Sequence, residues 1–321
     1  MQTRFAEFVM RRRLRLAIGI NAGLELAGVT MQQAVSQAEA QAAAALALHE
    51  RFQTPVLMTG MDLSVEAETF GCAIRFAEDE VPTVTGRRVQ TLADIAALTT
   101  PGPQPGRLPV YLEAARQLAA TGKPVLGGMI GPFSLAGRLF GVAEALEATA
   151  AEPALVITLL EKVTPFLIDY ALAFRETGAA GVIMAEPAAG LLSPRALGRF
   201  SAPYVRRIVE AVQTPDFAFI LHNCGAKLVH LPKLLESGVE IHHFGAPMDL
   251  PAALERVAEQ VILSGNLDPA EVFLNGTPES IRAHRRALLD ATVAYPNFFV
   301  SSGCDLPPGV PVENLTAFYE A

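Results

Sequence analysis

One histidine and two cysteines are the residues of this sequence best suited to chemistry. His222 and Cys224 lie one residue apart at the end of an apolar run, and Cys304 follows another apolar run 80 residues later. In an extended strand, residues i and i+2 point to the same side, so this imidazole and thiolate can bind one ion. One nitrogen and two sulfurs form a ligand set that suits zinc and leaves one tetrahedral position open.

A purely structural explanation of these residues stays open at this point. Free cysteines are commonly buried, and a core histidine commonly has a hydrogen-bond partner. Three cysteines in 321 residues do not make a disulfide framework, so each is a free thiol, a metal ligand or a nucleophile in a reducing compartment. Cys72 has no histidine nearby, and we expect it to be a structural thiol.

Further polar residues at or near the ends of apolar runs are candidates for substrate contacts. They are Asp62, Glu186, His243, Asn266 and Asp305. Asp305 is next to Cys304 and can orient a ligand, whereas a helix cap or a solvated carboxylate is the alternative for each acidic residue. His242 and His243 are adjacent on a predicted strand, so only one of them can face the interior of a barrel.

The elements that must position these residues follow a repeating pattern. Short apolar runs end in loops rich in glycine, proline and polar residues, and helix-length segments follow. Two of these helices have a capping residue before a proline, Ser193 and Asp268. The runs predict seven strands, at residues 55–58, 125–130, 181–184, 217–221, 239–244, 261–263 and 298–301.

Strands that alternate with helices indicate a parallel sheet. Seven or eight such units in about 300 residues favour a (β/α)8 TIM-type barrel, although the sequence does not locate an eighth strand. A doubly wound open sheet is the alternative, but no GxGxxG follows the first strand and no P-loop is present. In a barrel the carboxyl ends of all strands meet at one mouth, which would bring the histidine and the two cysteines together.

The chain is predicted to form a single domain over residues 1–321. Residues 1–54 contain an alanine-, glutamine- and glutamate-rich segment and are expected to be an N-terminal helical extension. Residues 71–106 interrupt the pattern with charged and turn-forming residues. We expect this segment to be an excursion over the barrel rather than a second domain.

The composition limits the kinds of partner. Apolar residues make up 51% of the chain and charged residues 18%, which excludes a disordered protein, and the net charge is −8. An acidic protein is poorly suited to sequence-independent binding of nucleic acids or anionic lipids. The longest apolar stretch, residues 124–137, is shorter than the about 20 residues of a membrane span, and no signal-peptide cleavage site is evident. We therefore predict a cytoplasmic protein that binds small molecules or proteins.

Together these motifs resemble the uroporphyrinogen decarboxylase superfamily, and within it the methylcobamide:coenzyme M methyltransferase branch. The resemblance extends from about residue 30 to the end of the chain, through MDLSVEAE at 61–68, LSPR at 192–195, LHNCG at 221–225, SGNLDP at 264–269 and SGCDLPPG at 302–309. It implies a (β/α)8 barrel with zinc on His222, Cys224 and Cys304. It also implies methyl transfer from a corrinoid on a partner protein to a thiol such as coenzyme M.

Two other functions are compatible with this fold. A uroporphyrinogen decarboxylase would be expected to carry an N-terminal Arg-Gln-Ala-Gly-Arg-Tyr motif, but the basic run at residues 11–15 lacks the glycine and the tyrosine. Decarboxylation would also leave His222, Cys224 and Cys304 unexplained. A non-catalytic metal-binding or tetrapyrrole-binding protein is the other alternative.

The sequence departs from the resemblance at one position. Many relatives have an acidic residue on the strand after His-x-Cys, whereas residues 243–247 here read His-Phe-Gly-Ala-Pro. The fourth zinc ligand is therefore left open. Water or a displaceable side chain is expected there, with Glu186 and one of His242 or His243 as the candidates.

Overall fold

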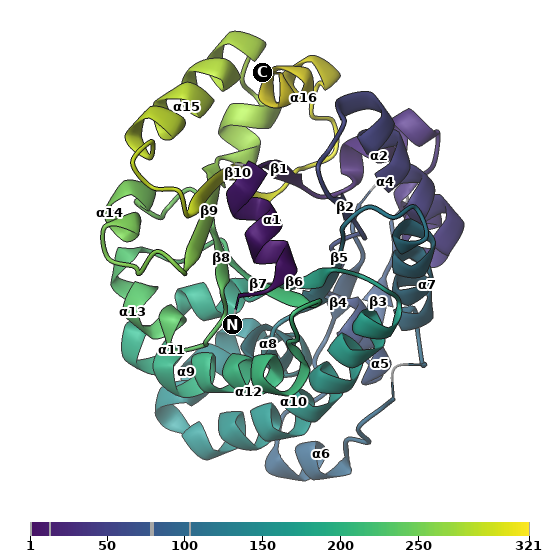
Figure 1. Cartoon of the computed structure of the whole chain (residues 1–321). Helices are drawn as coiled ribbons and strands as arrows, with labels where there is room; N and C mark the ends of the chain where they lie inside the picture. Colours follow the sequence, from purple (N-terminus) through teal and green to yellow (C-terminus); the bar gives the residue numbers. More distant parts are fainter. Residues whose placement is uncertain (1, 13, 78–79, 103, 321) are drawn as a thin grey trace.

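The computed structural model describes residues 2–12, 14–77, 80–102 and 104–320. Its eight parallel strands form one sheet in the order β1-β10-β9-β8-β7-β6-β5-β2, surrounded by helices (Figure 1). The (β/α)8 TIM-type fold is confirmed, and all seven predicted strands are present. The strands are β1 (Arg15–Ile18), β2 (Leu57–Met58), β5 (Val125–Ile130), β6 (Gly181–Ala185), β7 (Ala218–Asn223), β8 (Ile241–Phe244), β9 (Ile262–Leu267) and β10 (Phe298–Asp305).

The strand that the sequence did not locate is β1, inside the segment predicted as an N-terminal helical extension. It pairs with β10 through an irregular register between Leu16 and Ile18. Side chains complete the pairing, because Tyr319 accepts from the Ala17 N–H at 3.0 Å and Ser302 accepts from the Ile18 N–H at 2.8 Å. Within the described residues no ladder joins β1 to β2, which leaves a seam in the barrel.

Helix α1 (Arg4–Arg12) closes one end of the barrel. Its buried Phe5 and Val9 belong to the same apolar cluster as Ile220 and Ile241 of the barrel strands. The Arg4 N–H donates to the carbonyl of Pro215, just before β7, at 2.8 Å. This end therefore holds the amino ends of the strands, and Figure 1 shows α1 lying across it.

The predicted N-terminal helices are present, and further helices cover the outside of the barrel. The N-terminal ones after α1 are α2 (Asn21–Ala27), α3 (Met31–Ser36) and α4 (Ala38–Phe52). The longest is α10 (Pro153–Glu176), and no helix in the described ranges is both long and apolar enough to cross a membrane. The others are α5 (Val65–Thr69), α7 (Leu108–Ala119), α8 (Pro132–Phe140), α9 (Val142–Ala151), α11 (Pro194–Phe200), α12 (Ala202–Val212), α13 (Leu231–Leu235), α14 (Leu250–Leu254), α15 (Pro278–Ala291) and α16 (Val312–Tyr319).

The two predicted capping residues act as caps. The Ser193 side chain accepts from the Ala196 N–H at the start of α11. Asp268 accepts from the N–H groups of Ala270 and Glu271, each at 2.8 Å, at the start of a one-turn segment η3 (Pro269–Leu274). Both caps set the direction in which the chain leaves the barrel mouth.

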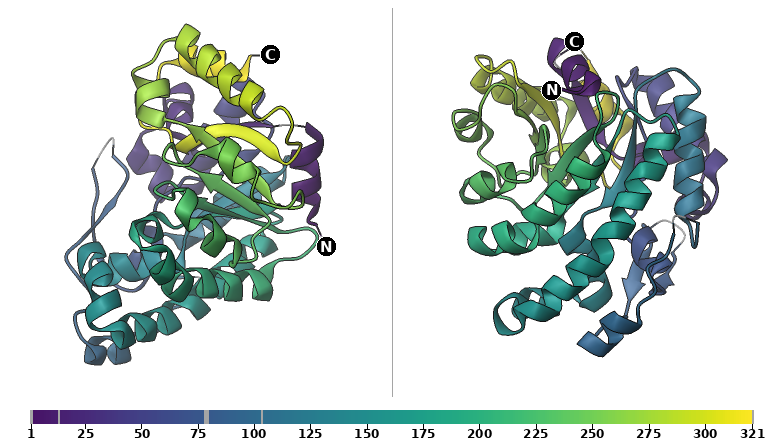
Figure 2. Two further views of the ribbon diagram at one scale, coloured as in Figure 1. Left: turned by 90° about the vertical axis from the view of Figure 1, so that its left-hand side faces the viewer. Right: turned by 60° about the horizontal axis from the view of Figure 1, so that its bottom comes forward.

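The segment predicted as an excursion, residues 71–106, adds no strand to the barrel sheet in its described part. It contains an antiparallel pair, β3 (Ala73–Arg75) and β4 (Thr83–Thr85), followed by α6 (Leu92–Ala97). The left view of Figure 2 places this blue segment at the end of the barrel away from α1. It therefore lies on the side of the mouth.

Candidate metal centre

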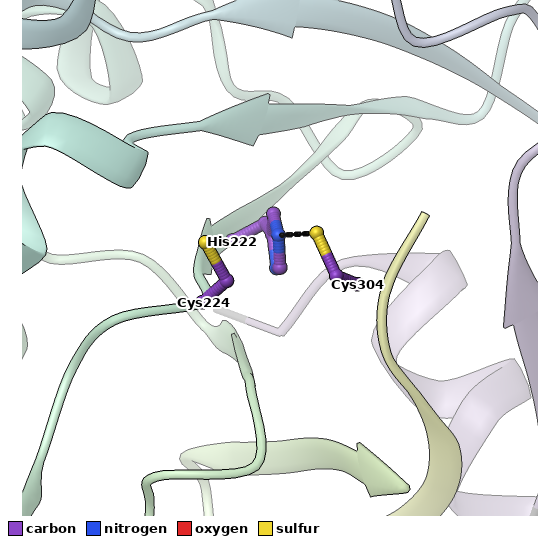
Figure 3. Close-up of side chains that lie close together, drawn as sticks. All are labelled: His222, Cys224 and Cys304. Atoms are coloured by element: carbon purple, nitrogen blue, oxygen red, sulfur yellow. Dashed lines mark hydrogen bonds between the residues drawn. The ribbon is translucent and has the colours of Figure 1, made fainter. Parts of the chain in front are cut away.

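His222, Cys224 and Cys304 lie together at the carboxyl ends of β7 and β10 (Figure 3). His222 Nε2 lies 3.5 Å from Cys304 Sγ, and one ligand atom from each residue lies within 4.8 Å of the other two. Strands β8 and β9 separate β7 from β10 in the sheet, so these side chains meet across the barrel mouth. The convergence depends on barrel closure and not on proximity in sequence.

The two cysteines of the metal-free protein have opposite pKa shifts. The neighbouring Cys304 lowers the pKa of Cys224 to about 4, although burial opposes the shift. The same contact and burial raise the pKa of Cys304 well above its usual range. A negative charge on this pair is therefore favoured on Cys224 over Cys304.

This donor set fits a tetrahedral metal ion. Bonds of about 2.0 to 2.3 Å from nitrogen and sulfur to zinc place neighbouring ligand atoms roughly 3.5 to 3.8 Å apart. The distance from His222 to Cys304 already has this value, and the limit of 4.8 Å on the whole set needs only small side-chain movements. His222 is 4% exposed, whereas both cysteines are partly exposed, so the site is not sealed from solvent.

His243 lies directly behind His222. The two Nδ1 atoms are 2.8 Å apart, and His243 Nε2 is 2.8 Å from Ser301 Oγ on β10. His243 is therefore the one of the adjacent pair that faces the barrel interior. The His242 ring instead packs parallel to Phe244 on the other side of the strand. Burial is the main cause that holds the pKa of His243 well below its ordinary value, and the neighbouring His222 is the second cause.

Glu186 binds the first turn of α8. Its carboxylate accepts from the Phe133 and Ser134 N–H groups, each at 2.9 Å, and from the Ser134 hydroxyl at 2.7 Å. Burial raises the pKa of Glu186 to about 7, although these bonds oppose the shift. With both oxygens engaged, the carboxylate is not directed toward the sulfurs, and a substrate role for it stays a prediction.

Asn266 and Asp305 lie close to the loops of the mouth. The Asn266 amide donates to the carbonyls of Gly245 at 3.1 Å and Met248 at 2.6 Å, so it fixes the loop after β8. One carboxylate oxygen of Asp305 is buried and has no hydrogen-bond partner among the described residues. Burial raises the pKa of Asp305 to about 7. Substrate contacts by these two residues also stay predictions.

Asp62 lies in a buried ion pair that the sequence analysis missed. Arg107 forms a salt bridge with Asp62 and donates to Glu68 at 2.8 Å and to the Ser64 hydroxyl at 2.8 Å. The Tyr111 hydroxyl donates to Asp62 at 3.1 Å. Side-chain exposure is 2% for Asp62 and 9% for Arg107. No regular spacing connects residues so far apart in sequence, so nothing in the pattern marked Arg107.

Glu66, a second acidic residue of the same segment, is buried with its proton retained. Its residue exposure is 1%, and Oε1 accepts from the Ile130 N–H at 2.8 Å. Oε2 has no hydrogen-bond partner in the described part of the chain. Burial raises the pKa of Glu66 from 4.5 to about 8.

We expect the contribution of Glu66 to the free energy of unfolding to fall as the pH rises from about 5 to about 8. Glu66 keeps its proton in the folded state up to about pH 8, whereas the unfolded chain loses it near 4.5, so ionisation favours unfolding across this window. Ionisation of Glu186 also favours unfolding, up to about pH 7. The difference in unfolding free energy between the parent and Glu66→Gln should therefore change by up to about 5 kcal/mol across this window, since each pKa unit is worth about 1.4 kcal/mol. Urea unfolding at pH 5, 6.5 and 8 measures this, and equal slopes in variant and parent would contradict it.

Comparison with known proteins gives consistent matches along the chain. The family profile described as uroporphyrinogen decarboxylase (URO-D) matches residues 8–321. The methylcobamide:CoM methyltransferase MtbA of Methanosarcina mazei is 32% identical over 303 residues, which are 92% of this chain and 88% of the relative. A uroporphyrinogen decarboxylase of Synechococcus sp. is 28% identical over 288 residues, covering 85% of this chain and 79% of the relative.

Solved structures agree on the fold. A methyltransferase from Methanosarcina mazei has a TM-score of 0.88 to this chain at 24% identity, covering 99% of this chain and 97% of that one. A B12-independent methionine synthase from Shewanella sp. has a TM-score of 0.58 at 13% identity, covering 88% of this chain and 84% of that one. Both likenesses concern the barrel as a whole.

Proposed function

The chain belongs to the uroporphyrinogen decarboxylase (URO-D) family of enzymes, and on that basis we propose that it is a zinc-dependent methyltransferase. It moves a methyl group from a corrinoid carried by a partner protein to a small thiol such as coenzyme M. The observation that carries this proposal is the convergence of His222, Cys224 and Cys304 at the barrel mouth. Similarity over 92% of the chain to a methylcobamide:CoM methyltransferase supports it.

In this proposal His222, Cys224 and Cys304 hold the zinc. When bound, the metal acts as a Lewis acid that lowers the pKa of a substrate thiol and leaves its sulfur nucleophilic. The two cysteine thiolates contribute negative charge, which keeps the substrate sulfur electron-rich. Because α1 closes the opposite end of the barrel, both the thiol and the bulky corrinoid must reach this site from the mouth.

The net reaction joins the thiol sulfur to the methyl carbon and breaks the bond between that carbon and cobalt. The electron pair of the broken bond stays on cobalt, so methyl-Co(III) becomes Co(I), and the thiol proton is released. The products are a thioether and the reduced corrinoid.

Free methylcobalamin tests the function directly. The zinc-loaded protein should consume it in the presence of the correct member of a panel of small thiols, and a strong chelator should stop the reaction. Release of carbon dioxide from uroporphyrinogen, without thiol methylation, would establish the decarboxylase alternative. A protein that retains the corrinoid without consuming it under any thiol would be a binding protein.

Among the described residues, the group that could hold a metal contains His222, Cys224 and Cys304 and no carboxylate. Gly245 lies in the stretch 243–247, where many relatives are expected to carry an acidic residue. A Cβ built at Gly245 would lie 2.2 Å from the Cys224 carbonyl oxygen, so the backbone excludes a side chain there. Glu186 is engaged by α8, and His243 Nδ1 by His222. A zinc ion held by His222, Cys224 and Cys304 would therefore keep one position for water or for the substrate sulfur.

We expect X-ray absorption at the zinc edge to change when the correct thiol is added. The resting site should show two sulfurs and two nitrogen or oxygen ligands, and the thiol complex should show three sulfurs and one nitrogen. About one proton should be released on binding, because the thiol binds as its thiolate. An unchanged sulfur count with a saturating, active thiol would contradict this mechanism.

A further inference from the structure

A chain of hydrogen bonds runs from the candidate metal ligand His222 to the backbone of the first strand. It passes from His222 Nδ1 to His243 Nδ1 at 2.8 Å, and from His243 Nε2 to Ser301 Oγ at 2.8 Å. The Ser301 hydroxyl then donates to the carbonyl of Leu16 in β1. His243, Ser301 and His222 are 1%, 0% and 4% exposed, so bulk water has little access to these bonds.

The last acceptor determines the direction of every bond in this chain. A carbonyl oxygen can only accept, so the single Ser301 proton points to Leu16, and the Ser301 oxygen accepts from His243 Nε2. A neutral imidazole carries one N–H, so His243 Nδ1 has a lone pair and accepts. The proton between the two rings therefore belongs to His222 Nδ1. His222 Nε2 is left with its lone pair, 3.5 Å from Cys304 Sγ.

This argument requires His243 to be neutral, and its surroundings provide for that. The ring is buried at 1% exposure, its two nitrogens face His222 and Ser301, and no described carboxylate forms a salt bridge with it. A charged imidazole without an acidic partner is costly in such a place. Protonation would also direct an N–H at His222 Nδ1 and would turn the proton of His222 toward the sulfurs.

We infer that His243 and Ser301 are positioning residues, which fix the proton of His222 on Nδ1 and so present Nε2 as a metal ligand. The inference rests on the metal site of the proposed function. A ring nitrogen must be unprotonated to bind a metal, and the partner of the other nitrogen fixes which one is free. Here the partner of the other nitrogen is a second histidine, His243, which is itself oriented by Ser301.

Two substitutions at His243 separate its contact with His222 from its contact with Ser301. The amide of His243→Asn reaches about as far as the imidazole Nδ1 and can still accept from His222. The amide of His243→Gln reaches the place of Nε2 and keeps contact with Ser301, but leaves His222 Nδ1 without its acceptor. His242→Asn is the matched control, because His242 lies on the same strand and is equally buried but points away from the barrel interior.

Zinc affinity, measured by competition with a chromogenic chelator, should distinguish these variants. His243→Gln should bind zinc about 10- to 100-fold more weakly than the parent protein, as expected for loss of a partner behind a ligating histidine. His243→Asn should fall between the parent and the glutamine variant, and the His242→Asn control should match the parent. Parent-like affinity in His243→Gln would overturn the inference.

Nitrogen-15 NMR of the metal-free parent protein tests the same inference without any substitution of histidine. Long-range nitrogen–proton correlations should show the His222 proton on Nδ1 and the His243 proton on Nε2. Ser301→Ala should convert both rings to mixtures of tautomers. A His222 proton on Nε2 in the parent protein would overturn the inference, even if the His243 variants failed to fold.

These measurements are independent of methyl transfer. A protein with the expected tautomers and variant affinities that methylates no thiol would leave the inference standing and overturn the proposed function. Thiol methylation by a protein with the opposite tautomer of His222 would do the reverse.

Discussion

Cys304→Ser should remove nearly all of the zinc and lower thiol methylation by at least about 100-fold. The proposed site has three side-chain ligands among the described residues, and a serine oxygen is a poor replacement for a thiolate on zinc. Loss of this ligand also removes the side chain that joins β10 to β7 across the mouth. Elemental analysis of the purified parent protein should find close to one zinc per chain, and Cys224→Ser should lower that number as sharply as Cys304→Ser.

The third cysteine provides the control for this experiment. Cys72 is buried outside the barrel sheet, and burial raises its pKa to about 11, so it is a poor metal ligand at neutral pH. Cys72→Ser should therefore keep full zinc and full activity. Full zinc in the Cys304→Ser variant would show that the distant ligand has been assigned to the wrong residue.

Arg107→Met should destabilise the protein by about 3 to 5 kcal/mol at pH 7. The substitution keeps most of the side-chain volume but leaves the Asp62 carboxylate buried without its cation, and such broken pairs typically cost this much. Tyr111 and Ser64 would still donate to Asp62, but neutral donors do not replace the charge. Urea unfolding, with the slope checked for constancy, measures the effect.

Two further variants identify the cause of that loss. Asp62→Asn combined with Arg107→Met should regain much of the stability, because no buried charge is then left without a partner. Arg207→Met breaks the exposed pair with Glu161, at 2.7 Å, and should cost less than about 1 kcal/mol. If the double variant is no more stable than Arg107→Met alone, an uncompensated Asp62 is not the cause.

The barrel, and the meeting of His222, Cys224 and Cys304 at its mouth, could be predicted because the strand signals are local. Each strand from β5 to β10 begins in an apolar run that is recognisable alone, and parallel strands bring their carboxyl ends to one mouth. The placement of His222 and Cys304 opposite each other follows from that topology. The predicted strands ended too early, because β7 extends through Asn223 and β10 through Asp305.

The features that the sequence did not predict depend on contacts between distant segments. Strand β1 has only four residues, and the N–H groups of Ala17 and Ile18 donate to Tyr319 and Ser302 near the other end of the chain. The Asp62–Arg107 pair likewise joins segments without a common period. The hydrogen bonds behind His222 could not be predicted either, because His243 on β8 meets Ser301 on β10 only in the folded barrel.

In the part of the barrel that the structure describes, the seam between β1 and β2 leaves β1 paired on one side only, with β10. Its amides at Ala17 and Ile18 should exchange with solvent deuterium whenever the side chains of Tyr319 and Ser302 swing away, without global unfolding. Each such opening also releases the Leu16 carbonyl, which orients Ser301. A metal bound to His222 would favour the state in which this hydrogen-bond chain is intact. We therefore expect zinc to slow deuterium exchange at the Ala17 and Ile18 amides.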